Sequence, residues 1–403
     1  MVIALGLAAG PAAALGLARF AYALLLPAMR DSLHWTFATS ALMNSANAVG
    51  YLLGAVAAAK VARRLGARPT FLGGLVFIAL ALLASALSGD LAVLVILRAV
   101  SGVAGAATFI IGAALTAQLG AREKPRRSAL LLGVYFAGGG LGIAVSGMVL
   151  PVMLAVTPAD AGWRWGWIAL GLTAVLSLAA AVPAAKRAPE PVHGAGQERA
   201  NGRAISMILI AYSLYGAGYI AYMTFIVALL EQGGAGTDEV TAFWIALGLA
   251  AMLGGFVWGP VIGRLRGGRG SALLMAVVAV GAALPLIDAS PAVHFASAAL
   301  FGIAFLAVVT AVTHTARTVL EPAQWTAGIA LLTTGFALGQ CIGPVLSGML
   351  ADIADGVRAG MLLSVGILAI AAVVALAQRQ PRKAGSPWAP APTSGSRCST
   401  ASP

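Results

Sequence analysis

The stretch LAVLVILRAVSGVAGAATFIIGAALTAQL, residues 91–119, decides the fold class of this chain. It is an apolar run with a single charge, Arg98, and a helix of about 20 apolar residues crosses the roughly 30 Å hydrocarbon layer of a membrane. The sequence therefore predicts a membrane-spanning helix that carries Arg98 at membrane depth. Because a guanidinium facing lipid costs about 2.5–3.5 kcal/mol, we expect Arg98 to face a bundle interior or a water-filled cavity. Gly102 and Gly105 follow on the same helix and allow a neighbouring helix to approach closely.

Eleven other apolar runs flank this one, and the 403-residue chain is 60% hydrophobic and only 9% charged. This composition is typical of an integral membrane protein. The fold class that we predict is an all-α membrane protein with twelve transmembrane helices. The apolar runs cover residues 4–29, 38–59, 70–88, 91–119, 128–156, 165–185, 205–230, 240–262, 271–287, 291–316, 325–349 and 357–377.

The basic residues predict how the chain lies in the membrane. The formal net charge is +12, but Lys and Arg fall in short loops between apolar runs, so the positive-inside rule explains them better than nucleic-acid binding does. Twenty of the 25 basic residues belong to the even-numbered loops, the middle segment and the C-terminal tail, and three belong to the other side. We therefore expect a multi-pass protein of a bacterial-type cytoplasmic (inner) membrane with both termini in the cytoplasm. The first run lacks the basic start of a signal peptide, which indicates an uncleaved span.

Two polar segments set the predicted domain boundaries. Residues 186–204 are rich in charge, Pro and Gly, and they separate an N-terminal six-helix bundle, residues 1–185, from a C-terminal one, residues 205–377. We interpret the separating segment as a cytoplasmic linker. Residues 378–403 have too little apolar surface to fold, so we predict a disordered cytoplasmic tail.

The two predicted bundles contain an internal repeat. At an offset of 200, the string Gly16-x-x-Arg19-x-Ala21-Tyr22 matches Gly216-x-x-Tyr219-x-Ala221-Tyr222. At an offset of 201, residues of the fifth span match residues of the eleventh, among them Gly138 with Gly339, Gly142 with Gly343 and Ser146 with Ser347. Because six helices separate the copies, the pseudo-symmetric bundles have the same orientation and are related by an axis along the membrane normal.

These features resemble the major facilitator superfamily over nearly all of residues 1–377. Arg98 with its two glycines is similar to the motif of the superfamily's fourth helix, in which the arginine lines the translocation cavity. The loop AKVARRLGAR, residues 59–68, is similar to the second-loop motif, although Arg63 stands where an aspartate is expected. The strings GLARFAYALLLP, residues 16–27, and GAGYIAYMTF, residues 216–225, resemble the YbfB/YjiJ-type branch. The resemblance implies a transporter that holds its substrate between the bundles, without naming the substrate.

Two arginines at membrane depth, without a nearby acid, predict the kind of substrate. Arg19 lies midway along the first span, and Tyr22 shares its helix face. All 13 acidic residues fall in or beside loops, so no carboxylate balances Arg19 or Arg98. A bound anion would supply the missing counter-charge, and guanidinium geometry suits a carboxylate or phosphate. We therefore expect a small organic anion as the substrate; the alternative is that backbone carbonyls satisfy both arginines inside a packed bundle.

Aromatic and amide side chains on other spans complete the candidate substrate site. Tyr219 and Tyr222 occupy the repeat positions of Arg19 and Tyr22, and they offer ring faces and hydroxyl groups. Amides on the second and eleventh spans are further candidates, although such polar groups also serve as interhelical hydrogen bonds. The predicted substrate-binding residues are Arg19, Tyr22, Asn47, Arg98, Tyr219, Tyr222 and Gln340.

His314 lies on a polar face of the tenth predicted span. An imidazole titrates near neutral pH, so His314 is our candidate for proton coupling. The alternative is a structural, hydrogen-bonded histidine.

These residues together predict secondary active transport of a small solute by alternating access, with a small organic anion preferred. The alternatives are an exporter of a neutral or amphipathic metabolite or drug, and a non-transporting membrane receptor or scaffold. An enzyme is not expected, because no nucleophile has an evident base and the four histidines have no spacing that suits a metal. We expect no cofactor, no metal and no nucleic acid as partners; the expected partners are the solute, the lipid bilayer and protons, and the expected functional unit is a monomer.

Overall fold

The computed structural model describes residues 1–121, 123–158, 160–190, 201–353 and 356–379. In these residues, twelve helical segments are long and apolar enough to cross a membrane, which confirms the predicted all-α fold. The helices in chain order are α1 (Val2–Pro11), η1 (Ala12–Phe20), α2 (Tyr22–Leu33), α3 (Phe37–Leu65), α4 (Ala67–Ser85), α5 (Leu91–Gly120), α6 (Pro125–Val156), α7 (Gly162–Arg187), α8 (Ser206–Gln232), α9 (Thr237–Ile262), α10 (Arg269–Ile287), α11 (Pro291–Phe305), α12 (Ala307–Val319), η2 (Pro322–Gln324), α13 (Trp325–Ile353) and α14 (Val357–Leu376).

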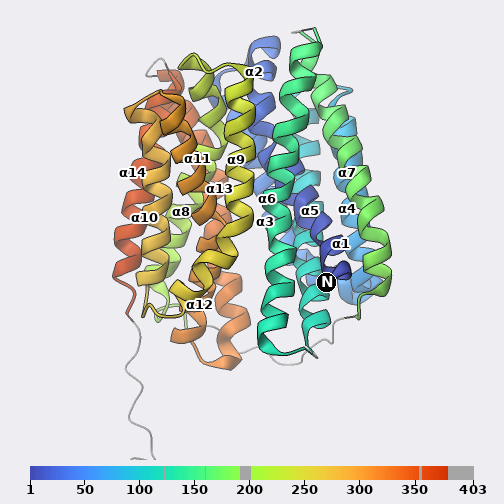
Figure 1. The fold of residues 1–403 in the computed structure, drawn as a ribbon, viewed down its shortest axis with the longest axis vertical. Helices are drawn as coiled ribbons and strands as arrows, with labels where there is room; N and C mark the ends of the chain where they lie inside the picture. Colours follow the sequence, from blue (N-terminus) through green and yellow to red (C-terminus); the bar gives the residue numbers. More distant parts are fainter. Residues whose placement is uncertain (122, 159, 191–200, 354–355, 380–403) are drawn as a thin grey trace, which may run out of the picture.

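The helices form two bundles, α1–α7 and α8–α14, which lie side by side in Figure 1. Their packing repeats as the sequence does. Gly54 of α3 lies against the backbone of Val103 in α5, and the repeat-related Gly254 of α9 lies against the backbone of Ile303 in α11. A Cβ at either glycine would clash with the partner helix, so these helices cross at small residues, as is usual in lipid. We call the surface along which the two bundles meet the seam.

The first span departs from this symmetry. It is built from α1, η1 and α2, and η1 is a π-helix, whereas the corresponding seventh span is the α-helix α8. π-Helices are rare and are frequent at functional sites. Gly138 of α6 lies against Ala8, but its repeat counterpart Gly339 of α13 lies against Ser213, which is five residues beyond the residue that the offset of 200 pairs with Ala8. Arg19 and Tyr219, which the sequence repeat pairs, are therefore not equivalent in packing.

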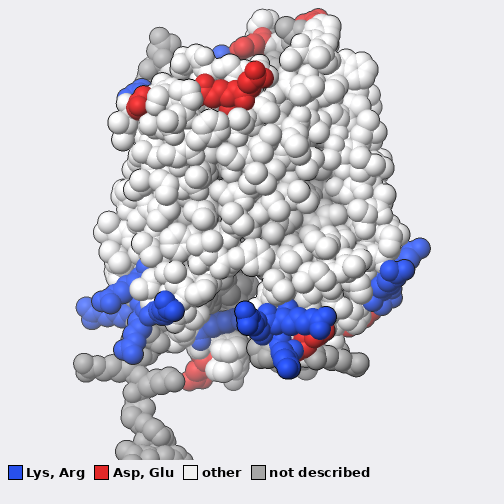
Figure 2. All heavy atoms as spheres, in the orientation of Figure 1, with Lys and Arg blue, Asp and Glu red and all other residues white. Residues whose placement is uncertain are grey.

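Charged side chains gather at the two ends of the helices. Figure 2 shows Lys and Arg mainly around one end and Asp and Glu mainly at the opposite end, with a few side chains of the opposite sign at each end. The basic end includes Arg63 and Arg64 in the last turn of α3. The acidic end includes Asp238 and Glu239 in the first turn of α9. Between the ends the surface is uncharged in this view, as a membrane-spanning protein requires.

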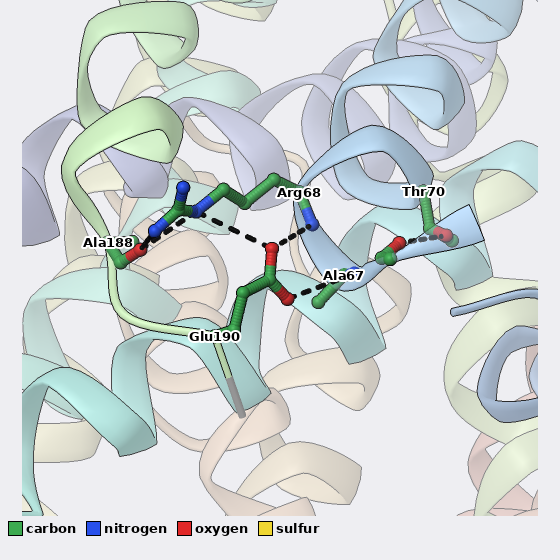
Figure 3. A network of polar contacts seen from close by, with 6 residues as sticks. Ala67, Arg68, Thr70, Ala188 and Glu190 are labelled. Atoms are coloured by element: carbon green, nitrogen blue, oxygen red, sulfur yellow. Dashed lines mark hydrogen bonds and ion pairs between the residues drawn. The ribbon is translucent and has the colours of Figure 1, made fainter. Parts of the chain in front are cut away.

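Glu190 fastens the start of the middle segment to the N-terminal bundle (Figure 3). Its carboxylate accepts hydrogen bonds from the backbone N–H groups of Ala67 (3.1 Å) and Arg68 (3.4 Å), at the first turn of α4. The Arg68 guanidinium in turn donates to the Ala188 carbonyl, with Nε at 2.9 Å. In the second-loop motif, Arg63 stands in place of the expected aspartate. The carboxylate that contacts the end of this loop is that of Glu190. Helix α7 ends at Arg187, slightly beyond the predicted boundary of the first bundle.

Gln378, which the sequence assigned to the tail, belongs to the C-terminal bundle. The side chain is 6% exposed, donates to the Ala204 carbonyl (2.8 Å) and accepts from the Ile208 N–H (3.1 Å). It thus closes the start of α8 at the basic end. Residues 191–200 of the predicted linker and residues 380–403 of the predicted tail lie outside the described residues.

Candidate functional site

Arg98 is held inside the N-terminal bundle by oxygen atoms of the protein itself. Its Nε donates to the Met43 carbonyl (3.2 Å), and its Nη atoms donate to the Ala18 carbonyl, to the Asn44 Oδ1 (3.0 Å) and to the Arg19 carbonyl (3.4 Å). The side chain is 1% exposed. This arrangement corresponds to the alternative that the sequence left open for Arg98, in which backbone carbonyls accept its donors inside a packed bundle.

Tyr22 and Asn47 also lie in the interior of this bundle. The Tyr22 hydroxyl donates to the Ser40 carbonyl (2.9 Å), and its ring stacks on that of Trp167 with centroids 6.3 Å apart. The Asn47 amide donates to the Ser101 hydroxyl (3.1 Å) and joins α3 to α5. Both were predicted to bind substrate, but the structure engages their polar groups in helix packing.

Tyr222 has the same kind of environment in the C-terminal bundle. Its hydroxyl is 2.8 Å from the Ser297 hydroxyl, and its ring stacks on Phe301 with centroids 4.0 Å apart. The side chain is fully buried. Tyr222 therefore joins α8 to α11.

Arg19 differs from these residues because its guanidinium reaches the seam. Its Nη2 donates to the Gln340 Oε1 (2.5 Å), and the Gln340 amide donates to the Tyr219 hydroxyl. The Arg19 cation lies 5.1 Å from the centre of the Tyr51 ring. The arginine and Tyr51 belong to the N-terminal bundle, and Gln340 and Tyr219 belong to the C-terminal bundle. We call these four residues the Arg19 cluster.

The Nε donor of Arg19 is buried without an acceptor in the described residues. Arg19 is 3% exposed, and its Nε has no hydrogen-bond partner among the described residues. Buried polar groups are normally paired, and each exception requires an explanation such as a ligand site. Among the candidate residues, Arg19, Tyr219 and Gln340 are thus brought together at the seam, with a free donor beside them.

Aromatic rings surround the Arg19 cluster on the side of the C-terminal bundle. The Tyr219 ring stacks on Tyr215 (5.1 Å between centroids), Phe336 (5.5 Å) and Phe305 (6.2 Å). Phe20, which follows Arg19 in the chain, meets Phe305 edge to face at 5.7 Å. The Tyr219 side of the cluster is therefore backed by a group of packed rings, which we call the aromatic wall.

Hydrogen bonds across the seam lie between the Arg19 cluster and the acidic end. The Asp352 carboxylate accepts from the N–H groups of Phe37 (2.8 Å) and Ala38 (3.0 Å), where α3 begins. Asn44 donates to Thr224 (2.7 Å). Trp244 of α9 also donates to Ser146 of α6 (3.0 Å). In the described part of the chain, no hydrogen bond crosses the seam between the Arg19 cluster and the basic end.

Sequence reasoning missed several of these partners. Asp352 is far from Phe37 along the chain, and His294 forms a close pair with Glu239 (2.5 Å) although the two residues lie on different helices. No local pattern marks such pairs. Tyr51 shares a helix face with Asn44 and Asn47, so the polar face of α3 was the available signal for it.

His314, the candidate for proton coupling, lies on α12 and is half-buried. Neither a hydrogen bond nor a ring contact joins it to the Arg19 cluster in the described residues. Within the same residues, no group of three or more His, Cys, Asp or Glu side chains is placed to hold a metal ion.

Two packed six-span bundles that meet along one seam are the architecture of the major facilitator superfamily. A family model described as "Uncharacterised MFS-type transporter YbfB" matches residues 11–376, and the chain belongs to this family. The resemblance read from residues 16–27 and 216–225 is thereby confirmed. No curated protein matches the sequence significantly.

Solved structures of other transporters share the fold. A bacterial homologue of the human lysosomal transporter Spinster, in an inward-facing and occupied conformation, has a TM-score of 0.73 at 15% identity, covering 93% of this chain and 95% of that chain. The nucleoside transporter NupG has a TM-score of 0.70 at 13% identity, covering 94% of this chain and 98% of that chain. At these identities the likeness shows the fold alone.

Proposed function

We propose that this chain is a secondary active transporter of a small organic anion, which it binds at Arg19 and moves by alternating access of its two bundles. The observation that carries the proposal is the Arg19 guanidinium, buried at the seam with an unpaired Nε. Its one side-chain acceptor, the Gln340 amide oxygen, is neutral, and in the described residues no carboxylate contacts it. An anion would supply both the counter-charge and the missing acceptor.

The hydrogen bonds across the seam support alternating access. They close the half of the seam that leads to the acidic end, whereas the other half has none in the described residues. Because basic ends of membrane proteins face the cytoplasm, these bonds lie on the outward side of the Arg19 cluster. Movement of one bundle against the other would break the bonds at the acidic end and open the site outward.

The test is uptake of organic anions into proteoliposomes. Arg19→Gln is expected to lower uptake about tenfold or more, because a hydrogen bond to a charged group is worth about 1.5–3 kcal/mol. Arg19→Lys should retain part of it. The matched control is Arg317→Gln, which removes an exposed arginine that faces the Trp325 ring at 5.4 Å. Equal uptake by Arg19→Gln and wild type would refute the anion site.

The aromatic wall favours a second candidate, an exporter of a neutral or amphipathic solute. Such a solute would bind Tyr219, Phe336 and Phe305 through its apolar surface. Export of a neutral aromatic compound that persists in Arg19→Gln would establish this alternative and exclude the anion.

The membrane orientation can be tested with a native cysteine. We propose that the basic end and both termini face the cytoplasm of a bacterial inner membrane. In a Cys341→Ser background, a membrane-impermeant maleimide should then label Cys398 in inverted vesicles and not in intact cells. Labelling in intact cells would reverse the orientation.

His314 remains our candidate for proton coupling, and we take the monomer as the functional unit. The half-buried imidazole has no hydrogen-bond partner among the described residues. His314→Gln should abolish uptake driven by an imposed pH gradient while leaving substrate counterflow intact. If His314→Gln leaves both the gradient-driven uptake and the counterflow intact, His314 is not the proton-coupling residue.

A further inference from the structure

We propose that the anion bound at Arg19 is an aromatic monocarboxylate, a flat apolar ring that carries one carboxylate. This inference rests on the proposed function and adds the substrate class. It follows from three features of the Arg19 cluster: the number of free cations, the partner that occupies the guanidinium, and the surfaces that surround it.

Among the described residues, a single cation is available at the depth of the cluster. Arg98 is also buried within the spans, but its donors are used by the carbonyls of Met43 and Ala18 and by Asn44. A second carboxylate on the substrate would therefore be buried without a partner, which is strongly unfavourable. Because one free guanidinium can pair with one carboxylate, we infer a substrate with a single negative charge.

Gln340 occupies the place that a carboxylate would take. A carboxylate binds arginine best with two parallel hydrogen bonds to two N–H groups on one edge of the guanidinium. The Gln340 Oε1 accepts only from Nη2, and Nε is left without a partner in the described residues. An amide offers one oxygen where a carboxylate offers two. Displacement of Gln340 by a carboxylate would satisfy both donors, and its amide would keep its bond to Tyr219.

The surroundings of Arg19 provide ring faces and few free polar groups. Tyr51 lies under the guanidinium and is only partly buried, as is Phe336 on the opposite side of the seam. The nearby amide of Asn44 is already bonded to the Thr224 hydroxyl. A substrate with several hydroxyl groups would find few partners here, whereas a flat apolar ring would pack against the partly buried rings of Tyr51 and Phe336.

The test is the affinity of purified transporter for four compounds, measured by calorimetry. Benzoate is the probe; cyclohexanecarboxylate has the same charge but no flat ring, benzamide has the ring but no charge, and succinate has a second carboxylate. We expect benzoate to bind at least tenfold more tightly than benzamide and succinate, and severalfold more tightly than cyclohexanecarboxylate. Preference for succinate or for cyclohexanecarboxylate would overturn the substrate class.

Two substitutions of Gln340 test whether its amide occupies the position of the substrate carboxylate on Arg19. Gln340→Glu places a permanent carboxylate on Arg19 and should abolish benzoate binding, whereas Gln340→Met frees the guanidinium and should tighten binding severalfold. Both variants change a side chain of similar size, so a purely structural role of Gln340 would weaken binding in both. Equal affinities in wild type, Gln340→Glu and Gln340→Met would also contradict the inference.

The outcomes separate this inference from the function on which it rests. If succinate or an aliphatic acid binds best and Arg19→Gln abolishes that binding, the anion transporter stands and the aromatic class falls. If benzamide binds as well as benzoate and Arg19→Gln has no effect, both proposals fall.

Discussion

Arg19 and Arg98 have the same side chain and nearly the same burial, 3% and 1% exposed, yet they lie in different regions of the molecule. Arg98 lies inside the N-terminal bundle, where oxygen atoms of α3 and of the first span accept its donors. Arg19 lies at the seam, with a neutral acceptor from the other bundle and with its buried Nε unused among the described residues. An arginine at membrane depth is thus not in itself a sign of an anion site. What indicates an anion site is whether N–H groups of the arginine lack acceptors within the protein.

The largest effect is expected at Arg98. Arg98→Met should lower the free energy of unfolding by about 3 kcal/mol, because buried carbonyls that lose a charged donor each pay a desolvation cost. The measurement is the unfolding midpoint of the purified protein in detergent. If the Arg98→Met variant is as stable as wild type but does not transport, Arg98 acts in substrate binding or movement and does not differ in role from Arg19.

The opposite result is expected for Arg19→Met. Replacement of an incompletely paired buried charge by an apolar side chain is often neutral or stabilising, so the stability should change by less than about 1 kcal/mol or rise. Uptake of anions should nevertheless be lost. A drop in stability comparable to that of Arg98→Met would show that both arginines are structural.

A smaller effect is expected where the seam closes at the acidic end. Asp352→Asn weakens the bonds to the N–H groups of Phe37 and Ala38, and the loss of a carboxylate at a helix N-terminus costs about 0.3–1 kcal/mol, up to about 2 when partly buried. The acidic end should then open more often. Cys341, which follows Gln340 on α13, reports this opening through faster labelling by an impermeant thiol reagent added from the acidic side, in a Cys398→Ser background.

The control for that experiment is Asp288→Asn, which removes an acidic-end carboxylate that bonds only within its own loop, to Ser290, in the described part of the chain. It should leave the labelling rate of Cys341 unchanged. Equal acceleration by both variants would mean that the general loss of negative charge, and not the bond to α3, controls the opening.

The smallest effect is expected at Glu190, far from both arginines. Its ion pair with Arg68 is partly exposed, with side chains 46% and 38% exposed, and such pairs contribute about 0–1 kcal/mol. Glu190→Gln should therefore lower the unfolding free energy by less than about 1 kcal/mol and leave uptake intact. The matched control is Glu123→Gln, which removes the exposed pair with Arg127. A strong loss of uptake in Glu190→Gln alone would show that the attachment of the middle segment controls transport.

Much of the fold could be predicted because its determinants are local in the sequence. Apolar runs define the spans, and glycines repeated in both halves mark the crossings of α3 with α5 and of α9 with α11. The candidate site was only partly predictable. Arg19, Tyr219 and Gln340 were identified as polar or aromatic groups at membrane depth, and the structure shows that they contact one another.

The remainder depends on features that side-chain patterns do not report. The acceptors of Arg98 are mostly backbone carbonyls, which every residue possesses. The first span contains the π-helix η1 and packs on α6 in a different register from that of α8 on α13, so equal spacing in the sequence paired Arg19 with a residue that is not its structural counterpart. Distant partners such as Asp352 and the start of α3 are joined only by the fold.

The π-helix also has a consequence for how the charge can move. A π-helix holds more residues in each turn than an α-helix, and Arg19 lies near the end of this segment. Rewinding of Ala12–Phe20 into an α-helix would rotate Arg19 about the axis of its own helix, away from Gln340. The first span could thereby withdraw its guanidinium from a bound carboxylate by a screw motion, and release of the solute would not depend on the tilting of the bundles alone.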